Sequence, residues 1–324
     1  MEILLQIVLL IVGFIILIKG ADWLVDGSSS IATNFKVSKS LIGLTIVAFG
    51  TSAPELAVSI TSLANGSTDM LLGNIIGSNI INVLLLVGVG AVICPIKVHK
   101  ETVRKELPIL LLVSTALVIL FLDTTLNSAD ANSITRSDAI ICLLFFGVFL
   151  YYLIVMALRN REAKTTKREK PKYKLGKAFV FAILGLVGLV VGSQLVVNSA
   201  TEIAHTIGVS DRIIALTIVA LGTSLPELVT TIVAAKHKET DLIVGNIIGS
   251  NIFNICIVMG IPVAIFGTIT PDSFQMVDLA MMVLSAVLLV LVTYRDKLIS
   301  RREGLLMLLV FALYYGYIVY GALA

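Results

Sequence analysis

One polar segment occurs twice in this chain, each time inside an apolar stretch. Residues 45–56 read Thr-Ile-Val-Ala-Phe-Gly-Thr-Ser-Ala-Pro-Glu-Leu, and residues 217–228 read Thr-Ile-Val-Ala-Leu-Gly-Thr-Ser-Leu-Pro-Glu-Leu. The two segments align at an offset of 172, at which 24 of 41 positions are identical between 42–82 and 214–254. The chain therefore has to fold as two related halves, each holding one Gly-Thr-Ser-x-Pro-Glu segment.

The composition is that of a membrane protein. Hydrophobic residues make up 57% of the chain, charged residues 14%, and the mean hydropathy is +1.02. Soluble domains carry about 25% charged residues. Apolar runs of about 18 residues or more recur along the chain, and each is long enough to cross a bilayer as a helix. We predict an all-α polytopic membrane protein whose ten transmembrane helices lie at about 3–31, 40–64, 69–94, 104–122, 137–158, 176–206, 212–235, 241–268, 276–293 and 304–323.

The distribution of basic residues predicts the orientation. All but three of the 24 Lys and Arg residues fall in odd-numbered loops; Arg136 and Arg212 lie in even-numbered loops and Lys19 lies in the first span. Because cytoplasmic loops carry the excess of positive charge, the odd-numbered loops are predicted to be cytoplasmic and both termini outside. We expect an integral protein of the plasma (inner) membrane of a prokaryote.

A basic hydrophilic linker at 159–175 separates the halves. The first five-helix repeat is predicted at 1–158 with its motif at 42–82, and the second at 176–324 with its motif at 214–254. Since an odd number of spans separates the two copies, they enter the membrane from opposite sides. Inverted repeats of this kind are typical of secondary transporters, whose substrate site lies near the membrane midplane where the copies meet.

Each motif is predicted to break its helix. Pro54 has no N–H, so the carbonyl of Gly50 loses its helical partner, and Pro226 has the same effect on the carbonyl of Gly222. At membrane depth a freed carbonyl must find a hydrogen-bond donor, a water or a cation.

Oxygen-bearing residues follow two helical stripes in each half. One stripe combines a main-chain carbonyl, a hydroxyl and a carboxylate, at Ala48, Thr51 and Glu55 and again at Ala220, Thr223 and Glu227. The other combines amides and a hydroxyl, at Asn74, Ser78 and Asn82 and again at Asn246, Ser250 and Asn254. These spacings place each set on one helix face.

This set of groups favours a site for hard cations. It contains oxygen ligands but no Cys or His, which suits Ca²⁺ and the similarly sized Na⁺ better than zinc or copper. A carboxylate at the bilayer centre costs about 2.5–3.5 kcal/mol on insertion scales. The presence of Glu55 and Glu227 therefore indicates a functional role for these carboxylates. Two glutamates neutralise one Ca²⁺ or two Na⁺, which is what an exchanger of these ions requires. We expect no cofactor, and a monomer suffices because one chain holds the whole site.

The first span carries three further charged residues, Lys19, Asp22 and Asp26. At offset 172 they align with Val191, Gln194 and Asn198, so they are not duplicated. We assign them to packing or to an access route in the outer half of the span rather than to ion ligation.

The motifs resemble those of a known family. The two Gly-Thr-Ser-x-Pro-Glu segments, each followed by Gly-Asn-Ile-Ile-Gly-Ser-Asn-Ile-x-Asn, resemble the α-repeats of the cation/calcium antiporter superfamily. The ten-span layout with its short central loop is similar to the prokaryotic sodium/calcium exchanger branch. The resemblance implies electrogenic exchange of several Na⁺ for one Ca²⁺ by alternating access, in which the first and sixth spans slide across a core of the other eight.

The resemblance also implies roles for individual residues. Glu55 and Glu227 match ligands shared by Na⁺ and Ca²⁺, and Asn82 matches a residue of the central position. Matches to hydroxyl ligands of flanking Na⁺ positions are Thr51, Thr223, Ser78 and Ser250, and matches to carbonyl donors are Ala48 and Ala220. Supporting residues around these ligands are Ser52, Ser224, Asn74, Asn246, Gly50, Gly222, Pro54 and Pro226.

Asn254 departs from the family pattern. Some relatives, including those that also transport K⁺, have Asp at this position. The amide lowers the negative charge of the site, which argues for exchange that is independent of K⁺ and leaves open whether Na⁺, water or a proton occupies the central position.

Three other functions remain as alternatives. An H⁺/Ca²⁺ exchanger could use the same two glutamates, because carboxyl groups crowded in a dry site can carry protons, although hydroxyl-lined Na⁺ positions would then have little purpose. A channel would more naturally be a symmetric oligomer with one filter segment per subunit. An enzyme is disfavoured, because the Thr-Ser-x-Pro-Glu segment has no His base beside it in the sequence.

Overall fold

The computed structural model describes residues 2–162, 170–208, 220–271 and 276–323, and nearly all of them are helical. Elements labelled α are α-helices and those labelled η are π-helical turns. The first half contains α1 (Glu2–Phe35), α2 (Lys39–Ile42), η1 (Gly43–Val47), α3 (Ala48–Thr51), α4 (Ala53–Ala64), α5 (Thr68–Ile80), η2 (Ile81–Leu86), α6 (Val87–Ile93), β1 (Ile96–Lys97), η3 (Thr102–Glu106), α7 (Leu107–Leu120), α8 (Asp123–Leu126) and α9 (Arg136–Glu162). The second half contains α10 (Leu175–Thr206), α12 (Ala220–Thr223), α13 (Leu225–Lys236), α14 (Thr240–Phe253), η5 (Asn254–Val258), α15 (Gly260–Phe266), α16 (Met276–Tyr294), β2 (Leu298–Ile299) and α17 (Arg301–Leu323).

The helices are long enough to cross a membrane. Among the described residues, seven helices pass by length and hydropathy, and the pair Lys39–Thr51 and Ala53–Ala64, bent by 42°, makes an eighth. The predicted span 104–122 is occupied by η3 and α7. The predicted span 212–235 begins outside the described residues and continues as α12 and α13.

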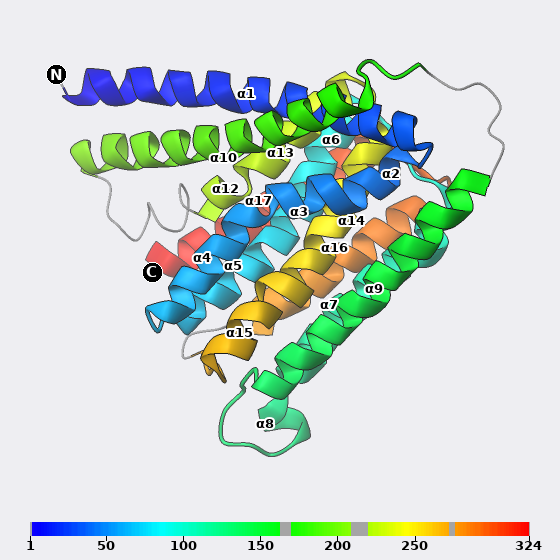
Figure 1. Ribbon diagram of the computed structural model, residues 1–324. Coiled ribbons are helices and arrows are strands. Elements are labelled where there is room, and N and C mark those ends of the chain that lie inside the picture. Colours follow the sequence, from blue (N-terminus) through cyan, green and yellow to red (C-terminus); the bar gives the residue numbers. More distant parts are fainter. Residues whose placement is uncertain (1, 163–169, 209–219, 272–275, 324) are drawn as a thin grey trace.

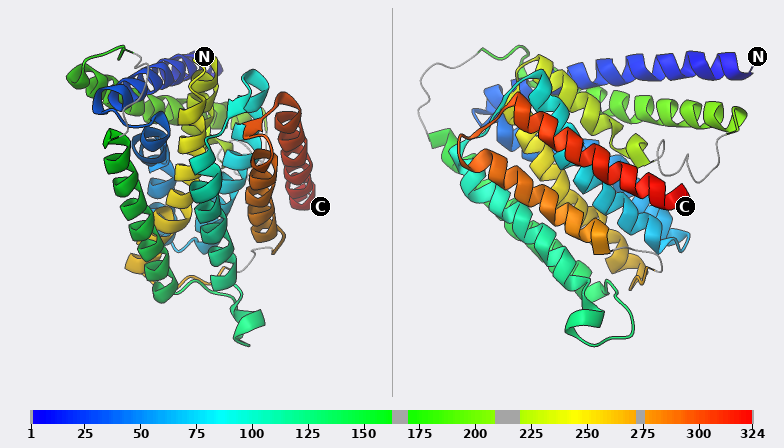
Figure 2. Two further views of the ribbon diagram at one scale, coloured as in Figure 1. Left: turned by 90° about the vertical axis from the view of Figure 1, so that its right-hand side faces the viewer. Right: turned by 180° about the vertical axis from the view of Figure 1, so that it is seen from behind.

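Helices α1 and α10 form a separate layer. They lie side by side and antiparallel across one side of the remaining bundle (Figures 1 and 2). The two backbones meet at glycines: a Cβ added at Gly185 would lie 2.5 Å from the amide nitrogen of Leu24, and one at Gly20 would lie 2.8 Å from that of Leu189. Because helices associate closely in membranes where small residues face each other, this seam holds the pair together as a unit.

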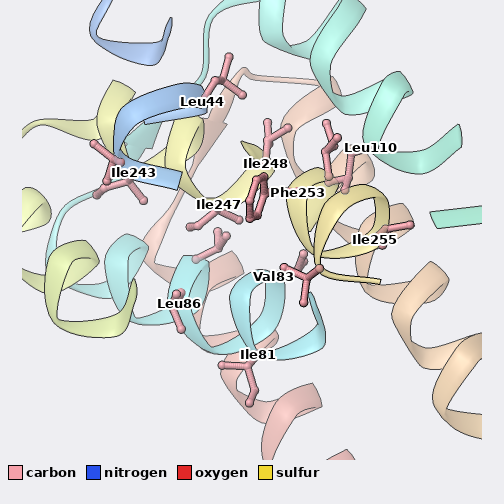
Figure 3. Packing of buried hydrophobic residues seen from close by; sticks show 14 of the residues in the cluster. Leu44, Ile81, Val83, Leu86, Leu110, Ile243, Ile247, Ile248, Phe253 and Ile255 are labelled. Atoms are coloured by element: carbon pink, nitrogen blue, oxygen red, sulfur yellow. The ribbon is translucent and has the colours of Figure 1, made fainter. Parts of the chain in front are cut away.

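Helix α14 lies at the centre of the bundle. In the apolar window of Thr240–Phe266, 94% of the residues are buried, against 17% in that of Ile3–Phe35. Apolar side chains of α14, including Ile247 and Ile248, pack between side chains of η1, η2 and α7 (Figure 3). Gly245 lets α14 approach the chain before the first break, where an added Cβ would lie 2.4 Å from the carbonyl oxygen of Ser40. The broken span is thereby fixed against a rigid, buried helix.

The loops repeat the internal symmetry. Strands β1 and β2 pair antiparallel, with Ile96 opposite Ile299, and an isolated antiparallel bridge joins Ile134 to Ile269. Lys97 in β1 and Ile269 are equivalent at the offset of 172. Corresponding loops of the two halves thus make similar strand contacts.

With the predicted orientation, the contacts of Asp22 and Asp26 do not fit a place in the outer half of the first span. Asp26 pairs with Lys172, which follows the linker, and His237 lies 3.5 Å from the Asp22 carboxylate and 3.7 Å from that of Asp26. Lys172 and His237 belong to the segments predicted to be cytoplasmic. The two aspartates therefore lie towards the side of the basic linker, where these partners reduce the cost of their charge.

Candidate ion-binding site

Each motif breaks its helix at a serine. Ser52, between α3 and α4, has φ −85° and ψ 7°, and Ser224, between α12 and α13, has φ −87° and ψ 6°. Pro54 and Pro226 each stand in the first turn of the helix that follows. The predicted break is confirmed, and its backbone geometry is nearly the same in both halves.

The two glutamates are buried directly after these breaks. Glu55 and Glu227 are each 1% exposed, and each lies in the first turn of its helix, where the partial positive charge of the helix N-terminus favours a carboxylate. The Ser52 hydroxyl donates to Oε1 of Glu227 at 3.3 Å, so the first motif contacts the carboxylate of the second. Within the described part of the chain, Oε2 of both glutamates has no hydrogen-bond partner.

Hydroxyls and amides surround the carboxylates. The Thr51 hydroxyl donates to Oδ1 of Asn246 at 3.3 Å, which links the first break to α14. Asn74 on α5 donates to the carbonyl of Glu55 and to Ser59, both at 3.1 Å. The Ser224 hydroxyl donates to that of Ser78 at 3.5 Å.

A group of asparagines continues the site along α5 and α14. Asn82 donates to Oδ1 of Asn251 at 2.9 Å, and Asn251 donates to the carbonyl of Asn79 at 3.4 Å. Asn254 is fully buried, and neither its amide oxygen nor its amide nitrogen has a partner among the described residues; the same holds for the hydroxyl of Ser250. Asn82 and Asn254 stand in η2 and η5, and π-helical turns of this kind are frequent at functional sites.

Sequence reasoning missed Asn79 and Asn251. They occupy equivalent positions in the two halves. Each directly follows the serine of the predicted stripe, Ser78 or Ser250, so helical periodicity places it on a different helix face. The sequence feature that could have identified them is that asparagine occupies this position in both copies of the motif.

The remaining predicted residues lie at or beside the breaks. Ala48, Gly50 and Gly222 are buried, and Thr223 is half-buried at the end of α12. The Ala48 carbonyl accepts from the amide of Ser52 at 3.1 Å and from the Thr51 hydroxyl at 3.5 Å. Ala220 is the first residue of α12 and directly follows residues outside the described ranges.

The freed carbonyl of the second break has a partner. Ser193 on α10 donates its hydroxyl to the Gly222 carbonyl at 2.9 Å. A freed carbonyl was predicted to need a donor, a water or a cation, and here a side chain of another helix supplies the donor.

The polar groups gathered at the two breaks are oxygen-bearing side chains. No group of three or more His, Cys, Asp or Glu side chains suited to a metal ion occurs in the part of the chain that the structure covers. What the elements bring together is two carboxylates, several hydroxyls and amide oxygens, in a buried region between two broken spans. This chemistry suits Na⁺ and Ca²⁺ rather than transition metals.

Comparison with known proteins identifies relatives over the full length. Residues 5–155 and 177–320 match the family described as sodium/calcium exchanger protein. The chain is 40% identical to the putative antiporter CaxA of Alkalimonas amylolytica, over 94% of this chain and 95% of that protein. It is 37% identical to the inner membrane protein YrbG of Escherichia coli, over 90% of each chain.

A solved structure is similar as well. The sodium-calcium exchanger NCX_Mj, soaked with Na⁺ and Sr²⁺, superimposes with a TM-score of 0.82 at 32% identity, covering 96% of this chain and 98% of that one. This match confirms the predicted all-α fold of ten spans in two inverted repeats.

Proposed function

The chain belongs to the sodium/calcium exchanger family, a family of membrane transporters and not of enzymes, and on this premise we propose that it is a secondary active antiporter that exchanges Na⁺ for Ca²⁺ by alternating access. The exchange is electrogenic and independent of K⁺. The protein is integral to the inner membrane, with its termini outside and its odd-numbered loops in the cytoplasm, and a monomer is sufficient.

The observation that carries this proposal is a set of buried oxygens without partners. Oε2 of Glu55 and of Glu227, Oδ1 of Asn82, the hydroxyl of Ser250 and Oδ1 of Asn254 all lack a hydrogen-bond partner among the described residues. A buried polar group left unpaired costs about 1–3 kcal/mol, more when it is charged. Cations that these oxygens coordinate would remove that cost, and the oxygens come from both motifs.

Each residue has a role in this proposal. Glu55 and Glu227 are ligands of both ions, and together they balance one Ca²⁺ or two Na⁺. The hydroxyl ligands for Na⁺ are Thr51, Thr223, Ser78 and Ser250; the carbonyl donors are Ala48 and Ala220; and the central amides are Asn82 and Asn254. The supporting residues that shape the two breaks and hold the ligands are Ser52, Ser224, Asn74, Asn246, Gly50, Gly222, Pro54 and Pro226.

Asn254 supports the independence from K⁺. It is an uncharged amide in a fully buried position, so the site has two carboxylates and no third. With fewer negative charges to balance, the site has no need of an additional monovalent cation beside Ca²⁺.

Exchange of H⁺ for Ca²⁺ remains the second candidate. The observation in its favour is the burial of two carboxyl groups that face the same region without a cationic side chain bonded to either in the described chain. Such groups can bind protons in place of metal ions.

The test is radioactive Ca²⁺ uptake by proteoliposomes preloaded with Na⁺, beside vesicles that have only a pH gradient. Uptake that requires internal Na⁺, ignores the pH gradient and is lost in Glu55→Gln and Glu227→Gln supports the sodium exchanger. Uptake driven by the pH gradient without Na⁺ contradicts it and supports the second candidate. Glu202→Gln, which neutralises an exposed carboxylate on α10, is the matched control and retains uptake.

A further inference from the structure

Helix α10 lies against both broken spans. A Cβ added at Gly50 would lie 2.2 Å from the side chain of Leu186, and one at Gly222 would lie 2.3 Å from that of Val197. Both of these neighbours belong to α10, and Ser193 stands between them. One helix of the α1–α10 layer therefore touches the glycine of each break.

Ser193 makes a polar contact between this helix and the second break. Its hydroxyl donates to the Gly222 carbonyl at 2.9 Å, and its side chain is 6% exposed. That carbonyl is available because Pro226, four residues later, has no N–H to donate. At membrane depth an unpaired carbonyl is costly, so the hydroxyl stabilises the break in the position seen here.

The first half has no equivalent bond. At the offset of 172, Ser193 corresponds to Ala21, whose side chain cannot donate a hydrogen bond. Among the described residues no side chain donates to the carbonyl of Gly50. The serine is therefore a feature of one half and not a consequence of the repeat.

We propose that Ser193 is a positioning residue that couples the position of α10 to the state of the second broken span. If α10 moves along the bundle, the hydroxyl leaves the Gly222 carbonyl, which must then bind water or a cation. The bond therefore favours the conformation seen here over the opposite-facing one. The inference rests on the proposed alternating access, since only a carrier that moves α10 against the break gives the bond this effect.

The test measures the two faces of the carrier separately. Exchange of unlabelled for radioactive Ca²⁺ in proteoliposomes of one orientation yields a half-saturating Ca²⁺ concentration for each face. In a two-state carrier, the ratio of these two concentrations follows the equilibrium between the two conformations. Loss of one neutral hydrogen bond shifts such an equilibrium by about three- to ten-fold.

We expect Ser193→Ala to change this ratio by about three- to ten-fold and Ser193→Thr, which keeps the hydroxyl, to restore it. Ser199→Ala is the matched control, because Ser199 is buried on the same helix and has no described bond to either break; it leaves the ratio unchanged. A purely structural role lowers the amount of active protein and the maximal rate but leaves the ratio alone. An unchanged ratio in Ser193→Ala, or an equal change in Ser199→Ala, overturns the proposal.

The test of Ser193 can succeed or fail independently of the test of sodium coupling. Exchange of Ca²⁺ for Ca²⁺ needs neither Na⁺ nor a pH gradient, so the ratio can be measured whichever ion drives net transport. Wild-type vesicles that exchange Ca²⁺ without responding to Na⁺ would contradict sodium coupling and leave the effect of Ser193 standing.

Discussion

The two halves of the molecule agree at the breaks and differ around them. Ser52 and Ser224 have backbone angles within a few degrees of one another, and a proline and a buried glutamate follow each. Yet Asn74 bonds within its own half, whereas its counterpart Asn246 accepts a bond from Thr51 in the other half. The duplicated part is thus the part that an ion would contact, and the surroundings have diverged.

The two halves also differ near the ends of the α1–α10 layer. On α1, Asp26 pairs with Lys172, and Ser29 donates to Glu239, which also pairs with Lys39. On α10, the residues equivalent to Asp22 and Asp26 are Gln194 and Asn198, which carry no charge. The two repeats are therefore alike at the breaks and the buried glutamates, and chemically different near the ends of α1 and α10.

The largest expected effect tests the equality of the two breaks. Glu55→Gln and Glu227→Gln each remove one of two charges from a buried site, so each lowers Ca²⁺ uptake by about 100-fold or more, the equivalent of losing about 2.7 kcal/mol or more of ion binding. Radioactive uptake at a Ca²⁺ concentration well below the half-saturating value of the wild type measures this. If one of the two variants keeps near-normal transport, the halves do not contribute equally.

The next effect concerns the glycine seam between α1 and α10. Gly185→Val places carbons where a Cβ would already lie 2.5 Å from a backbone nitrogen that cannot turn aside. We expect a destabilisation of about 1–3 kcal/mol or more and a large loss of monodisperse protein in size-exclusion chromatography. Gly147→Val on α9 is the control, since an added Cβ there meets no described atom within 4 Å. An equal loss of monodisperse protein in both variants would show that the close backbone approach at Gly185 is not the cause of the destabilisation.

A third prediction removes a difference from the family pattern. Asn254→Asp adds a third carboxyl group to the site, and this group can bind a proton where the amide cannot. Ca²⁺ uptake by this variant should change several-fold between pH 6 and pH 8 beyond any change in the wild type. Asn82→Asp adds the same charge at the equivalent position of the first half. If the ratio of Ca²⁺ uptake by Asn254→Asp to uptake by the wild type is the same at pH 6 and at pH 8, Asn254 does not lie among the ion ligands.

A smaller effect is expected from the ion pairs of α1. Asp26→Asn removes the partner of Lys172, whose side chain is 59% exposed, so the change in transport rate should be no more than a few-fold. It should shrink further in high salt, because salt screens exposed charges. Asn198→Ala, at the equivalent position on α10, is the comparison. A change that persists at 1 M salt would mean that the contact acts through packing instead.

The smallest effect is a dependence of stability on pH. The hydrogen bond to Asp241 is the main cause that raises the pKa of His99 above 6.5, against an opposing effect of partial burial. A raised pKa in the folded state stabilises the protein below about pH 6.5 and loses this contribution as pH rises through the higher folded-state value. His99→Asn should therefore lower the melting temperature slightly at pH 6 and not at pH 9. An effect that grows with pH would contradict this sign.

The sequence by itself determined the fold class, the duplication and the positions of the breaks. Apolar length fixes which segments can cross a membrane, and a proline in such a segment removes a hydrogen bond whatever surrounds it. For the same reason Glu55 and Glu227 could be singled out, because a carboxylate in an apolar span is costly in any fold.

Only the tertiary structure decided which partners these groups have. Helical periodicity indicates the face on which a residue lies but not which helix covers that face. The bond from Ser193 to Gly222, the contact of Asn251 with Asn82 and the pairing of Asp26 with Lys172 all join residues far apart in the chain. Such contacts depend on how α10 and α14 pack against the broken spans, and that packing depends on side-chain shape across the whole bundle, which no local pattern records.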